Sequence, residues 1–401
     1  MLKGKNIILG VTGSIAAYKI AGLASMLVKK GCHVQVLMTR NAANFINPIT
    51  FETLTGNKCL VDTFDRNFQF NVEHVSVAKT ADLVMVAPAS ANVIAKLAHG
   101  LADDMLTTTV LACKCKKFIA PAMNTNMYNN PIVQDNIKIC QSYGMEVIDP
   151  AFGYLACGDT GAGKMPEPET LYSYIEREAA YGKDLIGKKI LVTAGPTREA
   201  IDPVRFLTNH STGKMGYAIA RAASLRGAEV TLVTGKTEVP TPLFVKVLRV
   251  ESAKEMFEAV TEHALDQDAV IKAAAVADYR PKQVSTEKNK KKEGDLTLEL
   301  ERTDDILKWL GEHRKPGLFL CGFSMETQNM LENSRGKLDK KHIDMMVANN
   351  LKVQGAGFGT DTNVVTIITR EKETSLEKMT KEEVAHYLLK EIFSLKSKSS
   401  Q

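Results

Sequence analysis

The sequence predicts an α/β protein built from two doubly wound parallel sheets. The chain of 401 residues is too long for one ordinary hydrophobic core, so we expect two domains of about 180–200 residues. Both halves begin with a β-rich apolar run ending in Thr and Gly, GKNIILGVTG at 4–13 and GKKILVTAGP at 187–196. A helical stretch and a second strand follow each run, GCHVQVLMT at 31–39 and GAEVTLVTG at 227–235, so each half starts with a βαβ unit.

The alternation of strands and helices continues along both halves. Further strands are expected near 82–87, 117–121, 145–149, 245–250, 269–276, 317–323 and 344–348. The helical segment PETLYSYIEREAAYG closes the first half, which gives domains at 1–182 and 183–401. A β-hairpin around 358–370, an amphipathic helix near 380–394 and a frayed tail are expected at the end of the chain. In this architecture ligands bind beyond the carboxyl ends of the strands.

Composition and charge exclude several classes of protein. A net charge of +5 with interspersed acids and bases does not indicate nucleic-acid binding, and suits small anionic substrates better. The longest apolar runs are broken by polar residues and the amino terminus runs directly into a strand, so neither a membrane span nor a signal peptide is expected. Seven cysteines, an odd number, fit a reducing cytoplasm rather than a secreted disulfide framework.

Two stretches are similar to a phosphate-binding P-loop but lack its essential residues. In GYLACGDTGAGKMPEP, at 153–168, Met165 stands where magnesium coordination needs Ser or Thr, and a Pro-Glu-Pro segment follows instead of a helix start. In STGKMG, at 211–216, Met215 again replaces the hydroxyl, and Thr208 replaces the first glycine. Neither stretch is predicted to be a nucleoside triphosphate P-loop.

Polar residues at strand ends in the first half indicate a nucleotide site. Gly13 and Ser14 open an alanine-rich helix after the first strand, and Thr39 ends the second strand. Ser90 and Asn92 follow the strand near 82–87, in the ligand position of this architecture. Free amides and a hydroxyl at a helix start hold a phosphate, although Ser14 taken alone would serve equally well as a plain helix cap.

Three other residues of the first half are candidates for a catalytic role. His74 lies among apolar residues, where a lone histidine is more often structural than catalytic. Asn124 follows the strand KFIAPAMN and has a helix cap as its alternative role. Cys157 stands in a glycine-rich stretch that is expected to move. The CKC sequence at 113–115 lacks a second Cys/His pair at zinc spacing and is interpreted as structural.

Three longer stretches of the first half form recognisable motifs: VEHVSVAKTADLVMVAPASANVIAKLAHGLADDML, PAMNTNMY and ACGDTGAGKMPEP. With them the first half resembles the flavoprotein family of cysteine decarboxylases, and within it the phosphopantothenoylcysteine decarboxylases. The resemblance implies a flavodoxin-like domain with FMN, in which His74 is a base, Asn124 holds the substrate carboxylate and Cys157 is a proton donor on a lid. The flavin would oxidise the thiol-bearing carbon, so that CO₂ can leave, and then return the electrons. Tyr128 and Lys164 stand where the family more often has tryptophan and arginine, and they keep the aromatic and the cationic character of these positions.

The second half contains its own candidate phosphate site and cations. Ser211, Gly213 and Gly216 precede or open a helix and present amides to a phosphate monoester, or else form a cap with a close-packed glycine. Asp278 ends an expected buried strand in KAAAVADYR, which suits magnesium or a ribose. Lys337 and Lys341 are four residues apart and therefore share a helix face.

These stretches of the second half resemble the phosphopantothenate–cysteine ligase family, whose domain is Rossmann-like. The resemblance implies that phosphopantothenate attacks the α-phosphorus of CTP to give an acyl-cytidylate, from which the amine of cysteine displaces CMP. By motif, Asn209 stabilises the acyl intermediate and Ser211, Gly213 and Gly216 hold the substrate phosphate. The nucleotide, with Mg²⁺ at Asp278, is surrounded by the following residues: Asp278, Lys288, Phe323, Lys337 and Lys341. Asn289 replaces an apolar residue of the motif, so the lysine of 288–292 that contacts the triphosphate stays open.

Two alternatives belong to other functional classes. A flavin-binding regulatory subunit would keep FMN without catalysis, but it has no need of Asn124 together with Cys157. A dinucleotide-dependent oxidoreductase would need G-x-G-x-x-G after a first strand, and neither half has it. The resemblance also implies flavin sites at subunit contacts and therefore a homo-oligomer.

Overall fold

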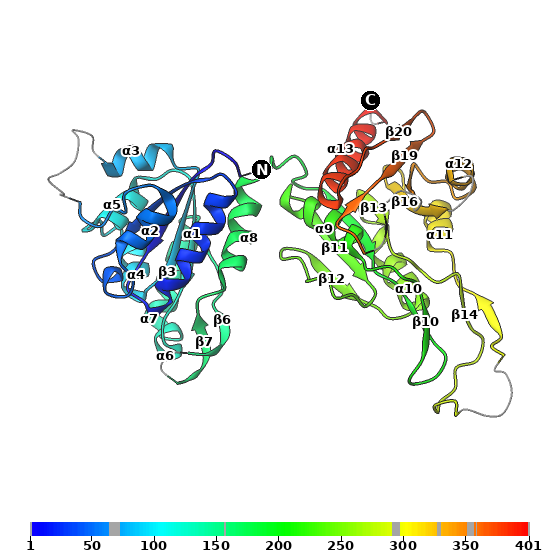
Figure 1. Cartoon of the computed structure of the whole chain (residues 1–401), viewed down its shortest axis with the longest axis horizontal. Helices are drawn as coiled ribbons and strands as arrows, with labels where there is room; N and C mark the ends of the chain where they lie inside the picture. Colours follow the sequence, from blue (N-terminus) through cyan, green and yellow to red (C-terminus); the bar gives the residue numbers. More distant parts are fainter. Residues whose placement is uncertain are drawn as a thin grey trace. The chain divides into compact units, whose positions relative to one another are not determined.

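The protein consists of two compact units, Met1–Gly182 and Lys183–Gln401, drawn in Figure 1. The computed structural model describes residues 2–63, 73–155, 158–290, 297–326, 330–350, 357 and 359–399. Each unit is an α/β structure with one main sheet, as expected from the sequence. Within the described residues, no helix combines the length and the apolar character needed to cross a membrane.

The first unit has a five-stranded parallel sheet in the order β2-β1-β3-β4-β5. Its strands are β1 (Asn6–Val11), β2 (His33–Met38), β3 (Leu83–Ala89), β4 (Lys116–Pro121) and β5 (Glu146–Val147). This order is that of flavodoxin-like folds, whose switch point lies between β1 and β3. The prediction of a doubly wound, flavodoxin-like sheet is confirmed.

Helices cover both faces of the first sheet because its central strands are apolar on both sides. Ile7 and Leu9 of β1 belong to a core with α1 (Lys19–Lys29), α2 (Pro48–Thr55) and α8 (Pro168–Ala179). Ile8 points to the opposite core. That core contains α4 (Ala91–His99), α5 (Met105–Ala112) and α7 (Pro131–Ser142), and α3 (Glu73–Thr80) packs against α5. Continuous apolar runs of this kind are typical of buried parallel strands.

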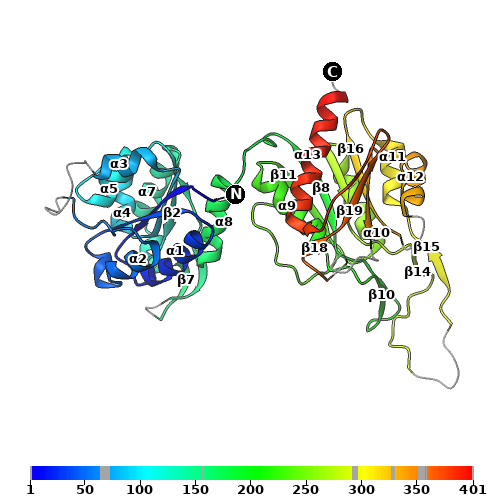
Figure 2. The same cartoon turned by 45° about the horizontal axis from the view of Figure 1, so that its top comes forward.

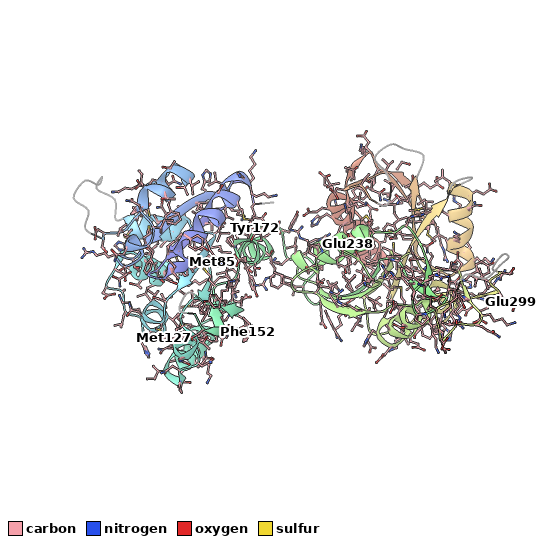
Figure 3. All side chains as sticks on the ribbon, turned by 60° about the horizontal axis from the view of Figure 1, so that its bottom comes forward. Met85, Met127, Phe152, Tyr172, Glu238 and Glu299 are labelled. Carbon is pink, nitrogen blue, oxygen red and sulfur yellow. The ribbon has the colours of Figure 1, made fainter. Side chains whose placement is uncertain are left out.

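A short helix and a hairpin extend one end of the first unit. The helix α6 (Thr125–Tyr128) follows β4, and β6 (Ala151–Tyr154) pairs antiparallel with β7 (Thr160–Lys164). Figure 3 labels Met127 of α6 and Phe152 of β6, which lie at the same end of the unit. The segment that is similar to a P-loop is therefore largely a hairpin strand, in agreement with its sequence interpretation.

The second unit has an eight-stranded sheet in the order β12-β11-β8-β13-β16-β17-β19-β20. The first six strands are parallel: β8 (Lys189–Ala194), β11 (Glu229–Thr234), β12 (Lys246–Arg249), β13 (Ala269–Lys272), β16 (Phe319–Glu326) and β17 (Met345–Asn350). Counted in chain order they run 3-2-1-4-5-6, which is the Rossmann order. The strands β19 (Val365–Thr369) and β20 (Glu373–Ser375) extend this sheet in antiparallel fashion.

Two groups of helices enclose the second sheet. One face packs against α9 (Lys214–Leu225) and α13 (Lys381–Ser399), which lie side by side (Figure 2). The other face packs against α10 (Ala253–Ala264), α11 (Ile306–His313) and α12 (Met330–Lys340). Small two-stranded ribbons flank the sheet: β9 (Arg198–Ala200) with β10 (Phe206–Thr208), β14 (Tyr279–Pro281) with β15 (Leu300–Arg302), and β18 (Thr362–Asn363) with β21 (Met379–Thr380).

Three local expectations in the second unit are wrong. The terminal hairpin joins β19 to β20, so it lies later in the chain than the expected 358–370. The strand expected to reach 276 ends at Lys272, and Asp278 therefore lies on a loop beyond the strand. The tail expected to fray continues α13 to Ser399, because Lys396 donates hydrogen bonds to the carbonyl oxygens of Asp268 (2.6 Å) and Gly317 (2.8 Å).

Candidate functional site

A polar cavity of about 1070 Å³ lies at the carboxyl edge of the first sheet. Four of the five residues predicted to bind a cofactor line it: Gly13, Thr39, Ser90 and Asn92. The fifth, Ser14, is not among the lining residues. Its Oγ accepts a hydrogen bond from the backbone N–H of Ala16 at 3.4 Å, so it caps the short helix Ile15–Tyr18. Of the two roles considered for Ser14, the observed geometry is that of a helix cap.

A buried threonine joins the two strands that border this cavity. The hydroxyl of Thr12 donates to the carbonyl oxygen of Pro88 at 2.6 Å and accepts from the backbone N–H of Ser90 at 2.9 Å. Thr12 is fully buried, so its hydroxyl has no water to replace these partners. Sequence analysis missed Thr12, although a threonine directly after an apolar strand was visible in GVTG.

The loop after β1 lies against the loop after β2. A Cβ atom on Gly13 would stand 2.8 Å from the Cβ atom of Asn41, so a larger residue would push the two loops apart. The backbone N–H of Thr39 donates to the carbonyl oxygen of Val11 at 3.0 Å, which continues the sheet to the edge of the cavity. Glycine is therefore required here for close approach.

Charged residues on the cavity wall are arranged in ion pairs. Lys96, half-buried on α4, donates to Asp103 at 2.6 Å and to Asp104 at 3.0 Å. The hydrogen bond that Lys96 donates to Asp103 is the main cause of the raised pKa of Lys96, and the same bond lowers the pKa of Asp103. Sequence analysis did not single out Lys96, because its partners follow the helix rather than the strand.

Asn124 connects α6 to the hairpin β6–β7. Its Oδ1 accepts from the backbone N–H of Asn126 at 2.8 Å, so Asn124 caps α6, which is the alternative role that the sequence offered for it. Its Nδ2 donates to Oδ2 of Asp159 at 3.0 Å, and this second bond was not expected. Asp159 stands just beyond Cys157, which lies outside the described residues.

One copy of the first unit does not bring His74 to Asn124. His74 is half-buried on α3 and is not among the residues that line the cavity. Figure 1 shows α3 and α6 at opposite ends of the first unit. By contrast, Met127 of α6 does line the cavity, so the end of the unit that carries Asn124 is the end near the cavity mouth.

The described cysteines and carboxylates form no metal centre. Among the described residues no group of three or more His, Cys, Asp or Glu side chains is placed to hold a metal ion. Cys113 is buried, whereas Cys115 is half-buried. A hydrogen bond from Cys113 lowers the pKa of the Cys115 thiol below its usual value.

A second cavity, of about 480 Å³, lies at the carboxyl edge of the second sheet. It brings together eight of the nine residues predicted for the substrate phosphate, the acyl intermediate and the nucleotide: Asn209, Ser211, Gly213, Gly216, Asp278, Phe323, Lys337 and Lys341. The ninth, Lys288, is exposed on a loop and is not among the lining residues. Arg205 contacts that loop and donates a hydrogen bond to the carbonyl oxygen of Asn289 at 2.7 Å.

The start of α9 forms the wall of this cavity on one side of the sheet. Gly213 is the N-cap of the helix, with φ of 79°, and as a glycine it offers the first-turn amides no side-chain acceptor. A Cβ atom on Gly216 would stand 2.6 Å from the Cβ atom of Ala194, which shows how closely α9 approaches β8. Such a helix start is suited to an anion.

Asn209 is held at the cavity by a long-range bond. Its Nδ2 donates to the carbonyl oxygen of Ala275 at 3.1 Å, which joins the β9–β10 ribbon to the loop after β13. The loop from 273 to 278 carries Asp278 to the cavity edge, where the side chain is exposed. Asp278 therefore reaches the cavity from a loop, whereas the sequence placed it on a strand end.

Lysines gather on the other side of the sheet. Lys341 pairs with Asp305 at 2.8 Å, and Lys337 lies one helical turn before it. Lys272, at the end of β13, is a third lysine of this cavity and was missed by sequence analysis. Burial, and then the charge of Lys341, lower the pKa of Lys272. An anion bound between these lysines would be stabilised by all three charges.

Comparisons with known proteins cover both units. The family described as Flavoprotein matches residues 1–180, and the family described as DNA/pantothenate metabolism flavoprotein C-terminal domain matches residues 185–395. A Bacillus subtilis (strain 168) protein named coenzyme A biosynthesis bifunctional protein CoaBC is 47% identical over 405 residues, covering 100% of both chains. A Vibrio vulnificus (strain YJ016) protein of the same name is 43% identical over 396 residues, covering 98% of both.

A solved structure is also similar. It is described as the C-terminal domain of coenzyme A biosynthesis bifunctional protein CoaBC, and it is 48% identical with a TM-score of 0.46. The match covers 53% of the present chain and 96% of that chain.

Proposed function

Since the chain belongs to the family of bifunctional coenzyme A biosynthesis proteins, and is an enzyme with decarboxylase and ligase activities, we propose that each unit carries one of the two reactions. Residues 183–401 join 4′-phosphopantothenate to L-cysteine with CTP. Residues 1–182 decarboxylate the resulting phosphopantothenoylcysteine to 4′-phosphopantetheine with FMN. The observation that carries this division is the presence of one polar cavity at the carboxyl edge of each sheet.

The residues around the first cavity fit FMN. The backbone of Gly13 and the start of α4, which Ser90 caps, offer N–H groups to a phosphate at the switch point of the sheet. The Thr12 hydroxyl keeps these two loops at a fixed separation. When bound, FMN supplies the two-electron acceptor that loss of CO₂ from an unactivated amino acid requires.

The chain's own residues would bind the substrate and move its protons. Asn124 would hold the departing carboxylate through Nδ2, and the Asp159 carboxylate that accepts this bond is the same chemical group as the proposed ligand. His74 would take the proton that leaves with oxidation, and Cys157, which lies outside the described residues, would return a proton to the product.

The decarboxylase site would require a second copy of the chain. His74 on α3 and Asn124 before α6 belong to opposite ends of one unit (Figure 1), so both roles are compatible only if α3 of one copy meets α6 of another. Large apolar side chains near α6 are exposed and available for such a contact: Met127, Ile132, Phe152 and Tyr154. We therefore place the decarboxylase site at a homo-oligomer contact.

The second cavity would hold phosphopantothenate and CTP from opposite sides of the sheet. Ser211, Gly213 and Gly216 at α9 would bind the phosphate monoester, while Asn209 would stabilise the acyl intermediate. Lys337 and Lys341 would neutralise charge on the triphosphate, and Asp278 would hold a Mg²⁺ ion that supplies further positive charge there. Phe323 would pack against the nucleotide, and Lys288 would join only if its loop closes over the cavity.

The cytoplasm is the compartment we assign to the enzyme. The six described cysteines are free thiols, as a reducing compartment favours. We expect small-molecule substrates alone, with no part for nucleic acid or a membrane.

One experiment tests the whole proposal. The purified chain is incubated with phosphopantothenate, cysteine, CTP and Mg²⁺, and the products are measured by mass spectrometry. The proposal expects a yellow protein that forms CMP, diphosphate, CO₂ and phosphopantetheine. A yellow protein that leaves CTP intact would refute the ligase assignment, and a colourless protein that cannot retain added FMN would refute the decarboxylase assignment.

A further inference from the structure

One buried acceptor of the second cavity has no donor among the described residues. It is Oδ1 of Asn349, a residue that lines the cavity. Asn349 stands near the end of β17, between Met325 of β16 and Val365 of β19. A buried carboxamide oxygen without a partner is unfavourable, so in natural proteins it usually marks a position that a ligand or water completes.

The alternation of side chains places Asn349 on the α9 side of the sheet. Val347 belongs to the core beneath α9 and α13, and Ala348 belongs to the core beneath α11 and α12. Because successive side chains of a strand point to opposite faces, Asn349 faces the same side as Val347. The proposed phosphate site at the start of α9 lies on this side, whereas Lys272, Lys337 and Lys341 gather on the other.

The neighbours of Asn349 on this side do not satisfy its oxygen. Asn363 is fully buried, and its donor group Nδ2 is directed at the sulfur of Met215, at 4.0 Å. Lys381 donates to the carbonyl oxygens of Gly357 and Thr360. The acceptor is therefore available for a group that enters the cavity next to the bound phosphate.

We propose that Asn349 is a specificity residue of the ligase site, whose side-chain oxygen accepts a hydrogen bond from a neutral donor of the phosphopantothenate chain. This inference rests on the proposed function. The substrate has two such donors, the hydroxyl of its pantoyl part and its amide N–H. A site built to bond a substrate hydroxyl or amide rejects analogues that lack it, because its own buried acceptor is then left unpaired.

The test separates recognition of phosphopantothenate from recognition of the other substrates. In Asn349→Leu, which keeps the size and removes the acceptor, KM for phosphopantothenate is expected to rise by about tenfold or more while KM for CTP and for cysteine stays unchanged. Asn349→Asp keeps an acceptor and is expected to retain more of the affinity. Thr366→Val removes a hydroxyl from the neighbouring strand and is expected to leave all three constants unchanged.

Three results would overturn the inference. A rise in KM for CTP alone would assign the oxygen to the nucleotide, and a rise for cysteine alone would assign it to the amine. An equal rise in KM for all three substrates, in Asn349→Leu and Asn349→Asp alike, would show that Asn349 is a structural residue. Failure of the unaltered enzyme to consume phosphopantothenate would instead refute the proposed function.

A substrate analogue distinguishes the two donors. Phosphopantothenate with hydrogen in place of the pantoyl hydroxyl is compared with the natural substrate, using the unaltered enzyme and Asn349→Leu. If the hydroxyl is the donor, the analogue is disfavoured only by the unaltered enzyme. If both enzymes disfavour it equally while the KM effect of Asn349→Leu persists, the bond belongs to the amide N–H.

Discussion

The side-chain amide of Asn124 donates a hydrogen bond to the carboxylate of Asp159, with 3.0 Å between Nδ2 and Oδ2. The other end of the amide accepts from the backbone N–H of Asn126 and caps α6. One residue therefore has two separable functions, a structural acceptor and a donor directed at a carboxylate. This separation makes the proposed role of Asn124 directly testable.

Replacement of Asn124 by aspartate is expected to remove activity without removing stability. Aspartate is an equally good helix cap, but it offers no N–H donor and would repel a substrate carboxylate. We expect the decarboxylation rate to fall by about 100-fold or more, with little change in Tm. The measurements are CO₂ release and thermal unfolding.

The matched control is Asn130→Asp. Asn130 caps α7 through the backbone N–H of Ile132 at 3.0 Å, and it does not line the cavity. This variant is expected to keep both stability and activity. Equal activities for the two aspartate variants would contradict the donor role of Asn124.

Mixed oligomers are expected to recover decarboxylation. If the site combines His74 of one copy with Asn124 of another, a His74→Asn chain and an Asn124→Asp chain are each inactive, but their mixture contains some sites with both native residues. The measurement is CO₂ release after the two chains are unfolded and refolded together, compared with each chain refolded alone. No recovery, in a mixture shown to contain hybrid oligomers, would argue that both residues act within one chain.

Thr12→Val is expected to weaken flavin retention. The change removes a buried hydroxyl and leaves the carbonyl of Pro88 and the N–H of Ser90 without partners, which costs about 1–3 kcal/mol of the free energy of unfolding. The flavin absorbance that remains after gel filtration measures the effect. Thr109→Val is the control, because Thr109 is equally buried but its hydroxyl donates to the carbonyl oxygen of Met105 within its own helix. Equal flavin loss in both variants would show that the position of Thr12 is not special.

Gly216→Ala is expected to abolish the ligase reaction and spare the decarboxylase reaction. The added Cβ atom would stand 2.6 Å from the Cβ atom of Ala194 and 2.8 Å from the carbonyl oxygen of Thr193, so α9 must move away from β8. Gly336→Ala in α12 meets no atom within 4 Å and is expected to be tolerated. CMP formation and CO₂ release, measured separately, check the two activities. A fully active Gly216→Ala enzyme would contradict a rigid phosphate site at α9.

The stability of the second unit is expected to fall as the pH is lowered. Burial, with help from Arg226 and Arg221, keeps the pKa of His386 below its usual value, while Glu382 acts in the opposite direction. The unfolded chain, with a histidine pKa of about 6.5, therefore binds this proton first as the pH falls. The contribution of neutral His386 to the free energy of unfolding is fully present above the histidine pKa of the unfolded chain. It is lost as the pH falls from there through the lower pKa of the folded protein.

His386→Gln is expected to reduce this pH dependence between about pH 7 and pH 5. Fluorescence of Trp309, the one tryptophan of the chain, reports unfolding of the second unit in urea. His342→Asn is the control, since His342 is exposed and its φ of 50° suits asparagine. If both variants kept the pH dependence of the unaltered chain, His386 would not be its source.

Residues that follow strands were within reach of sequence analysis. The apolar runs identified the strands, and parallel strands bring their carboxyl ends to one edge, so Gly13 and Ser90 could be predicted to lie near ligands. Asn209, which follows a strand of an antiparallel ribbon, was predicted only from the resemblance of its motif. Residues whose partners are distant in the chain could not be predicted in this way. Thr12 bonds to residues 76 and 78 positions away, and no local pattern indicates such a pair.

The sequence by itself determined two doubly wound α/β units, because hydrophobic periodicity is a local property that each segment carries alone. Its motifs also identified eight of the residues that line the second cavity. Tertiary structure decided which strands are neighbours, and it thereby placed the final hairpin beside β17 and ordered α13 through Lys396. It also separated His74 from Asn124, and it gave the oxygen of Asn349 no donor within the described part of the chain. These outcomes depend on the free energy of contacts between distant segments, which no single stretch of sequence contains.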